Sequence, residues 1–273
     1  MYKWHRCIEI MKVALAQFKV VSGQADLNLI EIERYLFQAK TEGASVVFLP
    51  EMCTTGLIWH FNPALLESAA AGVERVRLAA QRNRISVCGS FLEQTPGGNA
   101  ANTLYYFNAA GVLIAKYRKV HLFTMFHEEA HIEAGNEIII SDTDLGRTGF
   151  SICYDLRFPE LFRKCALAGA EFQVLVAAFP HPRLEHWRTL IRARAIENQS
   201  FFIAVNQCGY EGAGAAGGEI KYFGHSMIVD PWGEVVLEAG EEAGLFTAEL
   251  DCSLPTQVRA KLTALQDRRP DLY

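Results

Sequence analysis

The chain has 273 residues, half of them hydrophobic and about a fifth charged, and a formal net charge of −5 at pH 7. This composition supports a large packed core and differs from that of disordered proteins. The acidic balance, together with the absence of a long lysine/arginine run, disfavours a nucleic-acid or anionic-membrane partner, because both require a basic surface.

The first residues do not have the pattern of a signal peptide. Glu9 and Lys12 interrupt the apolar run, and no stretch of the chain reaches the roughly 18 consecutive apolar residues of a membrane helix. The periodic pattern begins near Met11, so we expect residues 1–10 to be an extension and residues 11–273 to form one domain. No internal repeat or low-complexity linker divides this domain.

Strand-like and helical patterns alternate along the chain. Helices are predicted from Asp26, as N-cap, through Leu29, Ile32, Leu36 and Phe37, then at 72–84, from Pro159 onward and at 184–199. Strands are predicted at 12–20, 44–50, 85–93, 148–153, 172–179, 201–207, 225–239 and 244–250, with a hairpin over 103–117 that turns at 108–111. Interleaved elements of this kind predict an α/β fold of layered sheets covered by helices.

The seven cysteines are widely spaced and form no C-x-x-C pair, so neither a zinc ribbon nor a thioredoxin-like motif is predicted. Without a secretion signal, free thiols and a cytoplasmic location are expected. Residues 212–217 satisfy G-x-G-x-x-G, but the run after them has strand character, whereas a dinucleotide site requires a helix there. Three histidines fall within 121–131 without metal-ligand spacing, so no metal site is predicted.

Cys153, in SICYDLRFPE, is the strongest candidate nucleophile. A lone cysteine in an apolar strand is most often a small buried side chain. This one ends a strand, a position where the sulfur faces solvent and the following N–H, of Tyr154, can point at a developing oxyanion. The helix predicted to begin near Pro159, together with Arg157, would favour the thiolate.

Glu51 and Lys119 also follow predicted strands. Taken alone, each would be interpreted as a solvated charge at the end of a strand. Because the strand ends of one sheet converge on one edge, however, we expect the two to meet Cys153 there. Glu51 would then be the general base and Lys119 the cation that stabilises an oxyanion.

The stretches LPEMCTTG, YRKVHLF and SICYDLRFPELFR resemble, in order, the three signature blocks of the nitrilase superfamily, the carbon–nitrogen hydrolases. The resemblance extends over residues 11–273. It implies an α/β fold, a four-layer α-β-β-α sandwich that pairs into a dimeric sandwich or a larger homo-oligomer. It also implies a catalytic triad of Glu51, Lys119 and Cys153, a thioester intermediate and no cofactor. Glu128 matches a second glutamate of the family, with Glu129 as the competing assignment.

Within the superfamily, the sequence is most similar to amidase branches. Omega-amidases, which cleave 2-oxoglutaramate, share the CYDLRFP block, and deaminated-glutathione amidases share GHSM, VDPWG and RRPDLY. Both substrates carry carboxylates, so the resemblance implies a cation in the pocket. Arg157 is the candidate, with an ordinary ion pair as the alternative. Tyr154 and Phe179 are candidate pocket walls, with core packing as the alternative.

Other functions remain open at this stage. N-carbamoyl amidohydrolases use the same triad. An amidotransferase glutaminase would need an acceptor-activating domain besides residues 11–273. A catalytically silent interaction module of the same fold should lack a triad member. A Cys–His hydrolase would use His121 or His186 as its base, and replacement of Glu51 would leave it largely active.

Overall fold

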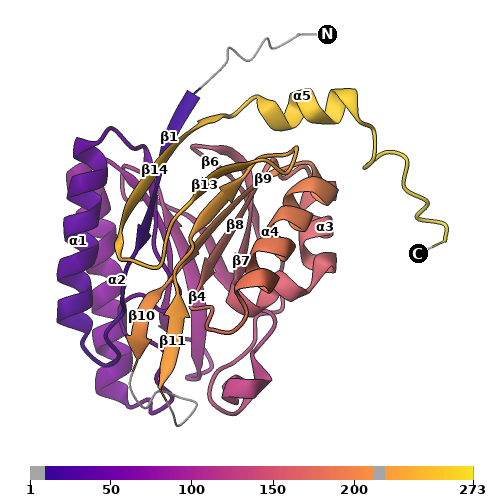
Figure 1. The fold of residues 1–273 in the computed structure, drawn as a ribbon. Coiled ribbons are helices and arrows are strands. Elements are labelled where there is room, and N and C mark those ends of the chain that lie inside the picture. Colours follow the sequence, from indigo (N-terminus) through magenta and orange to yellow (C-terminus); the bar gives the residue numbers. More distant parts are fainter. Residues whose placement is uncertain (1–9, 212–218, 273) are drawn as a thin grey trace.

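The computed structural model describes residues 10–211 and 219–272. Two six-stranded sheets face each other, and a pair of helices covers the outer face of each sheet (Figure 1). This arrangement confirms the predicted α/β fold with α-β-β-α layers. No helix in the described part of the chain is both long enough and apolar enough to cross a membrane.

The first sheet has the strand order β14-β1-β2-β3-β4-β5, in which β1, β2 and β3 are parallel neighbours and the other pairings are antiparallel. Helices α1 and α2 cover it (Figure 1). The bounds are β1 Ile10–Gln17, α1 Ala25–Thr41, β2 Val46–Phe48, α2 Pro63–Asn83, β3 Ser86–Gln94, β4 Ala100–Phe107, β5 Leu113–Arg118 and β14 Gly244–Asp251.

The second sheet has the order β13-β12-β9-β8-β7-β6, with β7, β8 and β9 parallel, and helices α3 and α4 cover it (Figure 1). Its elements are β6 Ile140–Thr143, β7 Gly146–Ile152, α3 Pro159–Leu167, β8 Phe172–Ala177, α4 Leu184–Asn198, β9 Phe201–Asn206, β12 Met227–Val229 and β13 Val235–Glu238. The remaining elements are the hairpin β10 Cys208–Glu211 with β11 Ile220–Phe223, helix α5 Leu254–Lys261, and the 3₁₀ turns η1 Thr124–Phe126, η2 Glu128–Ala130 and η3 Cys153–Arg157.

Most predicted elements are present, with local corrections. In α1, Leu29, Ile32 and Leu36 are buried as expected, but Phe37 is 66% exposed because it lies one position further round the helix, at the edge of the apolar stripe. Asp26 lies in the first turn of α1, and the cap position falls two residues earlier. The glycine pattern at 212–217 lies outside the described residues, and the strand β11, not a helix, follows it.

Helix α2 begins nine residues before the predicted start at 72. Its N-cap is Asn62, whose side-chain oxygen accepts the N–H of Leu65 at 2.8 Å, and Pro63 occupies the first turn. The residues that follow are mostly small, so the apolar periodicity there is weak although the capping signal is strong. Strand β6 and helix α5 were not predicted, since both are short and partly exposed.

Strand β2 shows how the core positions the site. Val46 and Phe48 point into the cluster between the two sheets, whereas Val47 packs into the cluster under α1 and α2. Burial of each such side chain stabilises the fold by roughly 1.5–3 kcal/mol. With both faces covered, the strand is fixed along its length, so the residue at its exit, Glu51, leaves the sheet in a defined direction.

Glu93, at the end of β3, links β3 to β5 and gives a pH-dependent prediction. Burial would raise the pKa of this carboxyl, but hydrogen bonds from Arg118, Lys116 and Thr103, at 3.0, 2.7 and 2.6 Å, lower the pKa to about 2. The folded-state pKa is below the usual value of 4.5, so Glu93 stabilises the protein above that pH. The stabilisation is then lost as the pH falls toward 2.

We therefore expect Glu93→Gln to lower the free energy of unfolding at pH 7 and to have a much smaller effect near pH 2. Urea unfolding curves at both pH values measure the difference. Glu67→Gln, at an exposed position on α2, is the control and should leave the free energy of unfolding unchanged at both pH values. An equal effect of Glu93→Gln at both pH values would contradict the assignment.

Candidate active site

Three strands deliver the residues singled out from the sequence. Glu51 follows β2, Lys119 follows β5 and Cys153 follows β7. The expectation that these strands belong to one sheet is wrong, because β2 and β5 lie in the first sheet and β7 lies in the second. The carboxyl ends of the parallel strands of both sheets meet at one end of the sandwich. Glu51 bonds across this junction: its N–H donates to the carbonyl of Ala177 at 3.3 Å, and its Oε2 accepts the N–H of Ala178 at 2.9 Å.

Lys119 is fully buried between two acids. Its Nζ donates to Oε1 of Glu51 at 2.9 Å and to Oε1 of Glu128 at 2.8 Å. Burial opposes the charge of the ammonium, but the charges of Glu128 and Glu51 outweigh it and raise the pKa of Lys119 well above its ordinary value. The lysine is therefore a permanent cation at neutral pH. Burial raises the pKa of Glu128, and the attraction of Lys119 offsets only part of that effect.

The two acids are themselves held in place. Asn102 Nδ2 donates to Oε1 of Glu51 at 2.8 Å, and the carbonyl of Asn102 accepts the N–H of Lys119 at 2.9 Å. Glu128 Oε2 accepts the N–H of Phe123 at 2.8 Å. Glu129 is exposed, so Glu128 is the glutamate that contacts the lysine. Asn102 was missed from the sequence, because it lies inside β4 and no motif marks it.

Cys153 is the first residue of η3 and has a φ of +47°. The left-handed region costs a non-glycine residue about 1–3 kcal/mol and is common at functional turns. The side chain is buried, and burial together with the charge of Glu51 raises the pKa of the thiol well above its ordinary value, with Lys119 opposing. The expected stabilisation of a thiolate is therefore wrong: the resting group at neutral pH is a thiol, because burial and the nearby carboxylate outweigh the cation.

The turn that begins at Cys153 leaves its first backbone donors without acceptors inside the turn. Tyr154 is the second residue of η3, and the first N–H groups of a helix have no acceptor within it. The ring of Tyr154 packs 4.8 Å from that of Phe123 and 5.3 Å from that of Phe158, measured between centroids. The side chain is thereby fixed at the pocket wall. The oxyanion role of its N–H stays a prediction.

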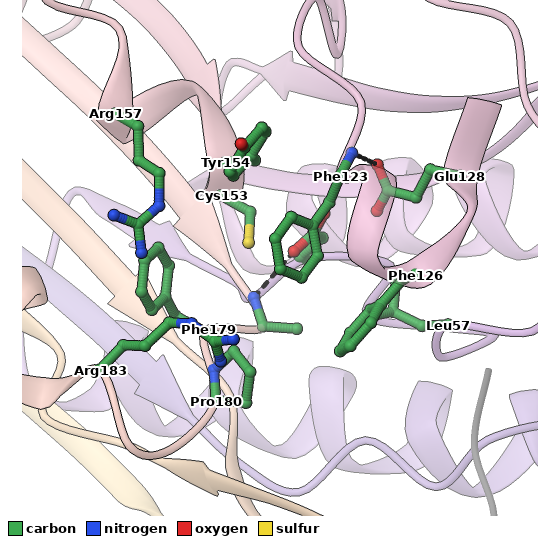
Figure 2. A pocket seen from close by; sticks show the side chains of 12 residues that line it. Leu57, Phe123, Phe126, Glu128, Cys153, Tyr154, Arg157, Phe179, Pro180 and Arg183 are labelled. Carbon is green, nitrogen blue, oxygen red and sulfur yellow. Dashed lines mark hydrogen bonds between the residues drawn. The ribbon is translucent and has the colours of Figure 1, made fainter. Parts of the chain in front are cut away.

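A cavity opens at this junction, with about 330 Å³ of space that includes its mouth to solvent, and Figure 2 shows its side chains gathered around the sulfur of Cys153. Lys119 does not line the cavity and instead faces the two carboxylates. The residues predicted from the sequence that do line it are Glu51, Glu128, Cys153, Tyr154, Arg157 and Phe179. The others are Leu57, Phe123, Phe126, Ala178, Pro180 and Arg183.

Two arginines lie on one side of the cavity. In Figure 2, Arg157 and Arg183 flank Phe179, on the side of Cys153 opposite Leu57. The guanidinium of Arg157 lies 5.5 Å from the ring centroid of Phe179. Neither arginine forms an ion pair with a carboxylate in the described part of the chain. Arg183 was missed from the sequence, since it lies in the irregular segment between β8 and α4.

The histidines occupy separate places. His121 Nδ1 lies 2.7 Å from Asp155, His131 stacks on Trp59 at 5.7 Å and His127 is exposed. No histidine is among the residues that line the cavity around Cys153. Within residues 10–211 and 219–272, no group of three potential ligands is arranged to hold a metal ion.

Comparison with known proteins agrees with this site. The sequence matches the carbon-nitrogen hydrolase family over residues 12–260. It is 32% identical to the 2-oxoglutaramate amidase of Bacillus subtilis, with 96% of this chain and 98% of that protein aligned. It is 34% identical to the deaminated glutathione amidase of Synechocystis sp., with 94% and 99% aligned.

Among solved structures, a mutant of the amidase from Nesterenkonia sp. AN1, in which acrylamide has added to the active-site cysteine, superposes with a TM-score of 0.82 at 26% identity. The superposition covers 96% of this chain and 98% of that one. The chain therefore belongs to the carbon–nitrogen hydrolase family. It is a hydrolase that acts on carbon–nitrogen bonds other than peptide bonds.

Proposed function

We propose that the protein is an omega-amidase-like enzyme that hydrolyses the terminal amide of a small carboxylate-bearing substrate, such as 2-oxoglutaramate, and releases ammonia. The observation that carries this proposal is the cavity itself. It combines Cys153, next to the carboxylate of Glu51, with two arginines that have no acidic partner among the described residues.

In the proposed reaction, Glu51 takes the proton of the Cys153 thiol as the sulfur attacks the amide carbon. Because the pKa of the thiol is raised, proton transfer and attack occur together, without prior accumulation of thiolate. The oxyanion is stabilised by the N–H of Tyr154 and by the positive charge of Lys119. Glu128 shares Lys119 with Glu51 and keeps its ammonium in place.

The adduct then collapses. The protonated Glu51 gives its proton to the leaving nitrogen, the carbon–nitrogen bond breaks, and ammonia departs from a thioester on Cys153. Glu51 next takes a proton from water, whose oxygen attacks the thioester carbonyl. The carbon–sulfur bond then breaks, Glu51 returns its proton to the sulfur, and the carboxylic acid leaves the restored thiol. The bonds from Asn102 and Ala178 hold Glu51 in one position for both half-reactions.

Arg157 and Arg183 are proposed to bind the substrate carboxylate, and Tyr154 and Phe179 to form the pocket walls. We expect Arg157→Met to lower kcat/KM for 2-oxoglutaramate roughly 10- to 100-fold, the loss of one charge-assisted hydrogen bond. The change should be mainly in KM. Butyramide, a neutral amide, is the control substrate, and kcat/KM for it should change little. A similar loss for both amides would contradict a carboxylate-binding role.

The experiment that tests the function measures product release from a panel of amides. Ammonia is measured for 2-oxoglutaramate, 2-oxosuccinamate and the N-carbamoyl compounds, and the released peptide part is measured for deaminated glutathione. Cys153→Ser is the control. The alignment with a deaminated glutathione amidase makes that substrate the second candidate. Turnover of 2-oxoglutaramate that depends on Cys153 supports the proposal. Wild-type protein inactive on the whole panel would favour a silent interaction module.

We also propose that the enzyme is a cytoplasmic homodimer or larger homo-oligomer, as the family resemblance implies. Light scattering coupled to size-exclusion chromatography measures the mass of the particle against the 30.5 kDa of one chain. A mass of one chain at micromolar concentration would contradict the dimer.

A further inference from the structure

Asp155 is a fully buried carboxylate that the proposed reaction does not use. Its Oδ1 accepts the N–H of His121 at 3.0 Å and lies 2.7 Å from Nδ1 of the same residue. Its Oδ2 accepts the hydroxyl of Tyr117 at 2.7 Å and the N–H of Ile152 at 2.8 Å. With the His121 tautomer that carries its hydrogen on Nδ1, this contact is a fourth hydrogen bond to the carboxyl group.

These donors flank two of the residues proposed to carry the reaction. Tyr117 and His121 lie two residues on either side of Lys119, at the end of β5 in the first sheet. Ile152 directly precedes Cys153, at the end of β7 in the second sheet. A single carboxylate therefore joins the segment that carries the ammonium to the turn that carries the sulfur, across the contact between the sheets.

The same carboxylate closes the turn at Cys153. The left-handed backbone of this residue, with a φ of +47°, persists only if its surroundings hold it. The bond from the N–H of Ile152 to Asp155 spans the cysteine and fixes the backbone on both of its sides. The Tyr117 hydroxyl bonds to the same oxygen atom, so the conformation of the turn and its distance from β5 depend on one group.

We propose that Asp155 is a positioning residue that holds Cys153 in its attacking orientation and at a fixed separation from Lys119. The inference rests on the proposed function, since it concerns the same sulfur and the same ammonium. Asp155 does not line the cavity and acts only through the residues that it holds. Misplacement of a reacting group by about 1 Å is enough to lower the rate on the order of 100-fold.

The test compares two variants with a matched control. Tyr117→Phe removes one donor from Asp155 and keeps the buried ring, and Asp155→Asn replaces an acceptor oxygen with an amide. The control is Tyr106→Phe. Tyr106 is an equally buried tyrosine of the first sheet, and its hydroxyl donates at 3.2 Å to Asp144, in the turn that precedes β7. It therefore makes the same kind of bond between the sheets, away from the cavity.

We expect kcat on 2-oxoglutaramate to fall on the order of 10-fold in Tyr117→Phe and 100-fold in Asp155→Asn, with KM changed less than about twofold. Tyr106→Phe should lower Tm as much as Tyr117→Phe does but leave kcat unchanged. Equal kcat values in the two tyrosine variants would overturn the proposal, even if Asp155→Asn fails to fold. A purely structural bond would lower Tm in both variants and kcat in neither.

A crystal structure separates failure of this inference from failure of the proposed function. If the wild-type protein hydrolyses none of the amides, the proposed function fails, but the backbone conformation of Cys153 in the variants can still be measured in the crystal. We expect Cys153 to leave the left-handed region in Asp155→Asn and to keep it in Tyr106→Phe. An unchanged turn in crystals of Asp155→Asn would overturn the inference.

Discussion

We expect Lys119→Met to lose amide hydrolysis and also to be less stable than the wild-type protein. The substitution keeps an unbranched side chain, one atom shorter, and removes its charge, so Glu51 and Glu128 face each other without the cation between them. Removal of one partner from a buried ion pair typically costs 3–5 kcal/mol. The rate should fall at least about 10²–10³-fold, the effect of losing one oxyanion donor. Ammonia release and urea unfolding measure the two losses separately.

The stability of this variant should also depend on pH. Without Lys119, only the hydrogen bond from the N–H of Phe123 still opposes the burial that raises the pKa of Glu128, so that pKa rises further. A carboxyl with a raised folded-state pKa stabilises the fold at low pH, and this contribution is lost as the pH rises through the folded-state value. Lys119→Met should therefore be closest to the wild type in stability on the acid side of neutrality. A difference in the free energy of unfolding between the wild type and Lys119→Met that stays constant from pH 5 to pH 8 would contradict the pairing of Lys119 with Glu128.

The double variant Lys119→Met/Glu128→Gln is the control for the two roles. Neutralising Glu128 removes one of the unpaired buried charges, so most of the lost stability should return. Hydrolysis should not return, because the positive charge proposed to stabilise the oxyanion is still absent. Recovery of activity in the double variant would mean that Lys119 acts only on folding.

Glu51→Gln should change the two properties of Cys153 in opposite directions. Hydrolysis should fall at least about 10²–10⁴-fold, because the amide cannot take the thiol proton. The pKa of the thiol should fall, because the charge of Glu51 is, after burial, the main cause of its rise. Absorbance of the thiolate near 240 nm, titrated against pH with Cys153→Ser as the blank, measures this pKa.

Glu129→Gln is the matched control for Glu51→Gln, since Glu129 is an exposed acid in the same region and should affect neither property. A Cys–His hydrolase would keep most of its activity in Glu51→Gln. That outcome would conflict with the lining of the cavity, where the described residues include no histidine. A raised or unchanged thiol pKa would show that the carboxylate and the sulfur do not interact.

The sequence predicted the layers and most of the strands, because apolar periodicity and turn residues are local properties. It also marked Glu51, Lys119 and Cys153, since each stands at or just after the end of a strand predicted from the sequence. Which sheet each strand joins depends on pairings between distant segments, so the sequence did not reveal that Cys153 comes from the second sheet. Asn102 is buried inside a strand and only its spatial neighbours reveal its contacts.

The state of the cysteine was predicted wrongly for a related reason. The charged residues near it in the sequence favoured a thiolate, but the depth of burial and the approach of Glu51 arise only from packing of the whole fold. Arg183 was missed because the segment between β8 and α4 is irregular and gives no periodic signal. Burial and loop geometry are thus the properties that single-sequence reasoning estimates least well.

The division of the site between two sheets has a mechanical consequence. Glu51 and Lys119 move with one half of the sandwich and Cys153 moves with the other, so the reacting groups are aligned only while the two halves stay together. Activity should then report on cohesion of the sandwich: during denaturation, turnover should disappear as soon as the sheets separate, even if each sheet keeps its own hydrogen bonds. Neither half of the chain, expressed by itself, would carry the complete set of groups.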